Sequence, residues 1–218
     1  EKEFIDRMFA SDISDVKPIE YAVRFSRSAV CAYLFSMKAV KVKYEGNMDL
    51  LSRLLYHLFV QSTNAQIANH ILTELSIKDK DKVIKILKHQ PAAPPADSVH
   101  RDTSYVYHRQ TIIVELVRFC PLRSLQEVIS FIGGEQPFID QFAFAVNDYD
   151  INITEHAVDY DNVEILGYLF SLKEIKNKYQ ESDELAWRLL YHLFHRSCEI
   201  ETLDFVLDKL DLSKERMA

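Results

Sequence analysis

The sequence predicts an all-α protein, built as a solenoid of about five stacked antiparallel helical hairpins. Three observations predict this fold. The 218 residues include only 4 glycines and 6 prolines, the apolar residues recur at helical spacing, and part of the chain is duplicated. Glycine and proline supply most tight turns, so a chain poor in both is a poor candidate for a β-sandwich or barrel. Apolar residues three and four positions apart give a helix one buried stripe.

The duplication relates residues 19–77 to residues 154–212 at a constant offset of 135. Of these 59 aligned positions, 22 are identical. The longest identical blocks are Arg53 to Phe59 with Arg188 to Phe194, and Tyr33 to Ser36 with Tyr168 to Ser171. The match extends upstream to residues 4–6 and 138–140 if one residue is inserted. Self-similarity at a fixed spacing is typical of repeat architectures.

Each copy divides into two helical hairpins. In copy one (4–77), polar breaks at 26–28 and 61–66 separate the two helices of each hairpin. The expected buried stripes of copy one are Ile19, Ala22, Val23, Val30, Leu34 and Phe35, followed by Leu54, Leu55, Leu58, Phe59, Ile67, Ile71, Leu72 and Leu75. Copy two (138–212) has the same pattern, with Val158, Ile165, Leu169, Phe170, Leu189, Leu193, Leu203, Val206 and Leu207.

The central segment, 78–137, predicts one more hairpin. Its stripes are Ile112, Val114, Leu116 and Val117, then Leu125, Val128, Ile129 and Ile132. Gly133 and Gly134 follow as a helix stop, and the proline-rich stretch 89–97 is expected to be a loop. A single hairpin cannot bury its apolar face alone, whereas stacked hairpins share a continuous core. We therefore expect one repeat domain over residues 1–218.

One segment resembles the T-P-L-H-x-A opening of an ankyrin repeat: Lys17-Pro18-Ile19-Glu20-Tyr21-Ala22-Val23. Residues 29–36 resemble the second ankyrin helix, and 154–158 with 163–171 match more weakly. Glu20 and Glu155 stand where the motif has histidine, and the usual Asp-Gly turns are missing. Divergent, glycine-poor ankyrin arrays resemble the arrays found in effector proteins of intracellular pathogens. The alternative fold is another solenoid of helical hairpins.

The resemblance implies a protein-interaction scaffold, because the first helices of ankyrin-like hairpins line a concave binding face. By resemblance, the residues exposed there are Tyr21, Arg24, Phe25, His156, Asp159 and Tyr160, with Tyr56 and Tyr191 as additions. Aromatic and arginine side chains are common at interface hot spots. The expected partner is a protein. A missing initiator methionine favours an excerpt of a larger effector or regulatory protein.

Composition narrows the partners and the compartment. Lys and Arg total 26 against 33 for Asp and Glu, a formal charge of −7, which argues against a nucleic-acid surface. No apolar run reaches the roughly 20 residues of a membrane span. The three cysteines, Cys31, Cys120 and Cys198, form no CxxC pair. This favours a reducing, cytoplasmic location, or the host cytosol for a secreted effector.

The sequence carries no phosphate loop and no hydrolase or zincin motif, so we predict neither enzymatic activity nor a cofactor or metal. Three weaker candidates for a metal or catalytic site stand against this prediction. They are a metal site at His192 and His195, a thiol–imidazole pair of Cys120 with His108, and an acidic cluster of Asp148, Asp150, Asp159 and Asp161 with Glu155. His57 and His192, in the repeated block, are expected to hydrogen-bond within the fold.

Two alternatives to the scaffold stay open. The first is an enzyme, such as a thiol-dependent hydrolase, with its site in 78–137. The second is an oligomerisation segment of a larger protein.

Overall fold

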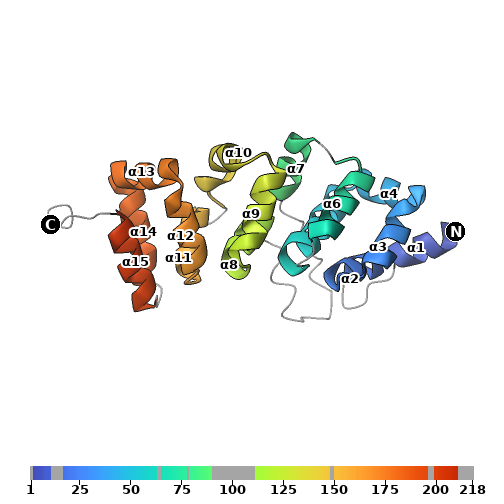
Figure 1. Cartoon of the computed structure of the whole chain (residues 1–218), viewed down its shortest axis with the longest axis horizontal. Helices are drawn as coiled ribbons and strands as arrows, with labels where there is room; N and C mark the ends of the chain where they lie inside the picture. Colours follow the sequence, from blue (N-terminus) through green and yellow to red (C-terminus); the bar gives the residue numbers. More distant parts are fainter. Residues whose placement is uncertain are drawn as a thin grey trace. The chain divides into compact units, whose positions relative to one another are not determined.

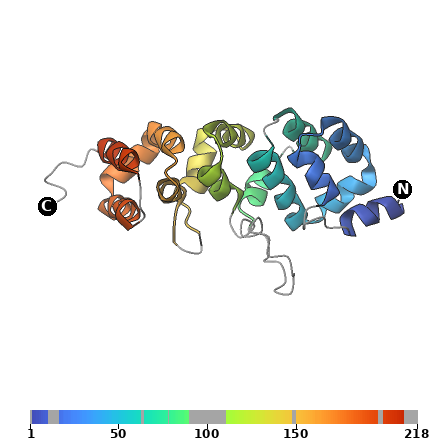
Figure 2. The same cartoon turned by 90° about the horizontal axis from the view of Figure 1, so that it is seen from below.

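The chain is all-helical in a computed structural model that describes residues 2–10, 17–62, 65–77, 79–89, 111–147, 150–195 and 199–210 (Figure 1; Figure 2). Among these residues there is no β-strand. The all-α prediction is confirmed. The chain packs as two compact units, Glu1–Glu115 and Leu116–Ala218, each with its own buried apolar core.

Unit 1 begins with α1 (Lys2–Ala10). It continues with α2 (Pro18–Arg24), α3 (Ser28–Ser36), α4 (Lys38–Glu45), α5 (Met48–Tyr56), the π-helical turn η1 (His57–Gln61), α6 (Ala65–Glu74) and α7 (Lys80–Leu87). The helix α8 (Ile112–Phe119) contains the boundary between the units. Unit 2 continues with α9 (Leu122–Phe131), α10 (Glu135–Phe138), the π-helical turn η3 (Ile139–Ala143), α11 (Ile153–Asp159), α12 (Val163–Ser171), α13 (Lys173–Glu181), α14 (Asp183–His195) and α15 (Ile200–Leu210).

The duplication is present in the structure as well as in the sequence. Five consecutive helices, α2 to α6, have counterparts in α11 to α15, and each pair of helices starts 135 residues apart. In both copies the first helix packs on the second, the second packs on the third, and the third packs on the fourth. The two halves therefore repeat one local packing scheme.

A third helix completes each repeat. The predicted hairpins contain two helices each and do not include the lysine-rich segments that follow the first hairpin of each copy. In the structure these segments form the helices α4 and α13. Val40 and Tyr44 of α4 are fully buried, as are Ile175 and Tyr179 of α13. Each pair is four residues apart, which places both side chains on one face while the lysines lie elsewhere.

The turn between the first two helices is the same in both copies and uses no glycine. Ser26 has φ 52° and Asp161, its counterpart, has φ 50°. In each case two backbone N–H groups close the end of the helix: those of Ser26 and Arg27 donate to Val23 and Ala22, at 2.9 and 2.8 Å. A residue with left-handed backbone after a helix is usually a glycine. The two copies thus have serine and aspartate, and not glycine, at this left-handed position.

The inserted residue in the duplication coincides with a π-helical turn. Ile5 and Asp6 correspond to Ile139 and Asp140 at an offset of 134. A few residues later Phe9 and Phe144, at an offset of 135, contact equivalent tyrosines: ring centroids are 5.4 Å apart for Phe9–Tyr44 and 6.1 Å apart for Phe144–Tyr179. Copy one is α-helical here, whereas copy two has η3. A π turn closes a wider ring, so it accommodates one more residue within a helix.

Two helices, α8 and α9, lie in the central segment where the sequence predicts them, and α9 ends before the glycine pair. Gly133 and Gly134 have φ 103° and 107°, a region that favours glycine. The predicted proline-rich loop at 89–97 lies outside the described residues apart from His89, as do His108, Asp148 and Cys198.

Candidate protein-binding surface

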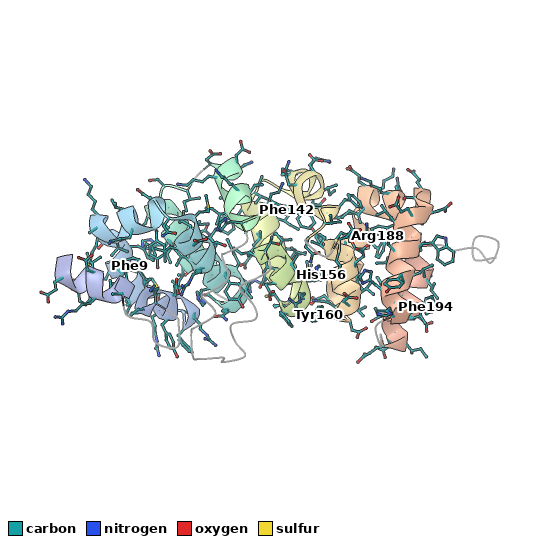
Figure 3. The ribbon with its side chains drawn as sticks, turned by 180° about the vertical axis from the view of Figure 1, so that it is seen from behind. Phe9, Phe142, His156, Tyr160, Arg188 and Phe194 are labelled. Atoms are coloured by element: carbon teal, nitrogen blue, oxygen red, sulfur yellow. The ribbon has the colours of Figure 1, made fainter. Side chains whose placement is uncertain are left out.

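A buried ion pair joins the first helix to the fourth in each copy. The Glu20 carboxylate on α2 accepts a 2.8 Å hydrogen bond from Arg53 on α5. In copy two, Arg188 on α14 donates to both oxygens of Glu155 on α11, at 2.9 and 2.9 Å. Both glutamates are fully buried. Figure 3 labels Arg188 on the C-terminal helices. In both copies the partners lie 33 residues apart in the sequence.

The same glutamates also close the N-termini of their helices. The backbone N–H of Lys17 donates to Glu20 at 2.9 Å, and that of Asn152 donates to Glu155 at 2.8 Å. Each carboxylate therefore satisfies a helix end and binds an arginine of the next repeat. These two roles account for a glutamate at this position in both copies.

The electrostatics of the two pairs differ. Burial raises the pKa of Glu20, because desolvation outweighs the attraction of Arg53. The hydrogen bonds that Arg188 donates to Glu155 raise the pKa of Arg188. Charges held in this way join two helices of the same copy. We interpret both pairs as structural clamps.

The repeated histidines bond within the fold, as predicted. His57 Nδ1 lies 2.7 Å from Gln61 Oε1, and His192 Nδ1 lies 2.8 Å from Asp159 Oδ1. His195 stacks on Tyr191, with ring centroids 5.0 Å apart. No group of three or more metal-ligating side chains occurs among the described residues.

The acidic cluster of copy two is engaged internally. Asp150 contacts Arg188, whose guanidinium also donates to the Asp150 carbonyl. Asp161 accepts a 3.1 Å hydrogen bond from the backbone N–H of Glu199. With Asp159 bonded to His192, each described aspartate of the cluster has a partner within unit 2.

Five of the eight predicted binding residues are exposed. They are Tyr21, Arg24, Phe25, Tyr160 and Tyr191. The exposed fractions are 41% for Tyr21, 51% for Phe25 and 40% for Tyr160. Tyr160 is labelled in Figure 3, where it lies at the end of its helix.

Of the other three predicted residues, Tyr56 and His156 are buried and Asp159 is partly buried, so the expectation that they are exposed was wrong. Tyr56 is 9% exposed and His156 is 5% exposed, and the side chain of Asp159 is 3% exposed. His156 Nε2 lies 2.9 Å from the side-chain amide of Asn147, in the segment before α11. Asp159 faces the histidine of α14. Polar groups bonded in this way pack inward, although their helical positions matched those of exposed ankyrin residues.

Four of the five exposed residues, all except Tyr191, belong to two aromatic–arginine clusters. Cluster one consists of Tyr21, Arg24 and Phe25 in unit 1. The Tyr21 and Phe25 rings are 5.0 Å apart, and Arg24 Cζ lies 5.6 Å from the Phe25 centroid.

Cluster two consists of Arg118, Phe119 and Tyr160 in unit 2. Arg118 Cζ lies 4.2 Å from the Tyr160 centroid and 4.8 Å from that of Phe119, and the two rings are 5.3 Å apart. Arg118 also donates to the Tyr160 hydroxyl. Sequence reasoning missed Arg118 and Phe119, because they lie about 40 residues from Tyr160 and local spacing does not relate them. Tyr160 is the counterpart of Phe25 in the duplication.

The two cysteines that the structure describes, Cys31 and Cys120, are both buried, and burial raises the pKa of Cys31 to about 11. His108, the proposed partner of Cys120, lies outside the described residues.

The chain is an all-helical protein with an internal structural repeat. Comparisons with protein-family models, curated proteins and solved structures find no match to it. In the part of the chain that the structure describes, every helix is too short or too polar to cross a bilayer.

Proposed function

We propose that this chain is a protein-interaction module of ankyrin-like stacked helical repeats, which binds a partner protein through the two aromatic–arginine clusters. Binding is by surface complementarity, without turnover. The observation that carries the proposal is the recurrence of an exposed aromatic residue, in contact with arginine, after the first helix of each copy.

The spacing of long-range contacts supports stacked repeats within each unit. Partners in successive repeats lie 33 residues apart in Glu20–Arg53, Lys41–Glu74, Glu135–Tyr168, Glu155–Arg188 and Asp159–His192. A constant separation means that each repeat contacts the next in one register. Successive first helices start 30 residues apart and successive second helices 37 residues apart, values on either side of the ankyrin period. The third helix of each repeat takes the place of the turn that links ankyrin hairpins.

The chemistry of the clusters supports partner binding. Tyrosine and phenylalanine offer large contact areas with little loss of side-chain freedom, and arginine adds donors that remain charged. Contact with a ring orients each arginine before binding, which reduces the ordering cost on association. Such residues dominate the binding energy of many interfaces. The clusters suit a partner that presents acidic and apolar groups together.

We also propose a reducing location such as the cytoplasm, which the buried thiols and the negative charge support.

An affinity capture that compares variants tests the proposed function. Arg24→Asp with Phe25→Ala disrupts cluster one, and Phe119→Ala with Tyr160→Ala disrupts cluster two. Tyr33→Ala, at a position that is 64% exposed and outside both clusters, is the matched control. A true partner is retained by the control and depleted at least about tenfold by a cluster variant of unchanged helicity. If every protein bound by the wild type is also bound by both cluster variants, the proposal fails.

A further inference from the structure

The same helix face is buried in copy one and exposed in copy two. On α5, Ser52 is 1% exposed and Tyr56 is 9% exposed. Their counterparts on α14 are Trp187 and Tyr191, which are 59% and 60% exposed. These positions are α-helical in both copies, so the difference does not come from backbone conformation.

The exposed face continues along α14. Phe194 is 70% exposed, and Figure 3 labels it on the C-terminal helices. Its counterpart Phe59 is 3% exposed and lies in the π-helical turn η1. Residues 187, 191 and 194 are four and three positions apart, so they form one stripe. We call Trp187, Tyr191 and Phe194 the α14 stripe.

Copy one shows what packs on this face. Helix α7 packs against α5 and buries Val83, Ile86 and Leu87. These aliphatic residues occupy i, i+3 and i+4, the pattern of an amphipathic helix laid on an apolar surface.

An acidic residue marks the end of the same face. His89, just after α7, places Nε2 2.5 Å from Asp49 Oδ1, and its carbonyl accepts a bond from Ser52 at 3.5 Å. The counterpart of Asp49 is Glu184, which is exposed at the start of α14. Copy two thus keeps both parts of the surface that α7 uses: an apolar stripe and a carboxylate at its end.

We infer that the α14 stripe binds an amphipathic helix of a partner protein, one with an α7-like aliphatic stripe followed by a basic or histidine residue. The contact is distinct from the aromatic–arginine clusters and does not depend on them. Tryptophan and tyrosine at the centre of an exposed stripe are the residue types that anchor such helices.

The chain contains its own reporter, because Trp187 is its only tryptophan. The probe is a synthetic peptide with the sequence of residues 79–89, which has no tryptophan or tyrosine. Added to the full chain, it should shift Trp187 emission to the blue and protect the indole from acrylamide, with saturation. A peptide with Val83, Ile86 and Leu87 all changed to serine should bind at least about tenfold more weakly.

Two variants of the chain separate the stripe from its surroundings. Phe194→Ser should weaken peptide binding about tenfold, and Glu184→Lys about two- to fivefold. Tyr33→Ser, on an exposed face of unit 1, is the control and should bind as the wild type does. Circular dichroism checks that each variant keeps its helicity.

The inference is overturned if the emission is unaffected at millimolar peptide, or if the serine-substituted peptide acts equally well. It is also overturned if light scattering shows a dimer that Phe194→Ser dissociates, because the occupant of the stripe would then be a second copy of this chain. The two proposals can fail separately. If the cluster variants lose partner capture but still bind the peptide, the clusters and the stripe act independently. If peptide binding fails while partner capture by the clusters stands, only the inference about the stripe is lost.

Discussion

Replacing Arg188 by methionine tests whether the buried ion pair holds α11 to α14. Methionine keeps much of the apolar stem of arginine and removes the guanidinium. The carboxylate of Glu155 then keeps its bond from the Asn152 N–H but loses both bonds to Arg188. Because Glu155 is fully buried, its charge is left without compensation.

The structure sets the size of the expected loss. Removing one partner of a buried ion pair costs about 3–5 kcal/mol. The Arg188 side chain is 26% exposed, so water screens part of the interaction and we expect the lower end of this range, about 3 kcal/mol. For a unit of this size, urea unfolding has a slope of about 1–3 kcal/mol per molar, so the midpoint should fall by about 1–3 M.

Urea unfolding followed by far-UV circular dichroism measures this effect. The double variant Glu155→Met with Arg188→Met is the matched control, because it leaves no unpaired charge in the core. It should recover most of the lost stability. A midpoint for Arg188→Met close to that of the wild type would refute the reasoning. A double variant less stable than the single one would also refute it.

Three further predictions follow from backbone strain, burial and titration. Gly134→Ala should cost about 1–3 kcal/mol in thermal or urea unfolding, because φ is 107° there, whereas Gly46→Ala, at φ −91°, should be neutral or slightly stabilising; equal effects would contradict the strain argument. Burial raises the folded-state pKa of Glu20 above 4.5, so its contribution to stability is present near pH 4.5 and is lost as pH rises through the folded pKa. The free energy of unfolding of Glu20→Gln, relative to that of the wild type, should therefore increase between pH 4.5 and neutral pH in urea titrations. A relative decrease would disprove the raised pKa of Glu20. Cys31, buried with its pKa raised to about 11, should resist alkylation until the chain unfolds; rapid native labelling of this residue by mass spectrometry would count against its burial.

Several structural features follow from the sequence. Helical spacing predicts α2, α3, α5, α6, α8 and α9 with breaks where the structure has them. The gapless self-alignment predicts that the two copies fold alike, and the single inserted residue has a structural equivalent in η3. The sequence analysis missed α4 and α13, because their short apolar stripe, two residues four positions apart, is outnumbered by lysines.

The binding surface is harder to predict from the sequence than the helices are. Aromatic and arginine positions on the first helices were predicted from resemblance, and five of the eight are exposed. His156 was assigned to the exposed side although Asn147 covers it. Arg118 joins Tyr160 only through the packing of α8 beside the end of α11, which no local pattern encodes.

The sequence by itself determined that the chain is helical, where most of the helices of the repeated block lie, and that this block occurs twice. Only the tertiary structure decided what covers each face. Tyr56 and Tyr191 stand in identical seven-residue blocks, yet one is 9% exposed and the other 60%. Helical periodicity depends on neighbours along the chain, whereas burial depends on the segments that fold onto the helix.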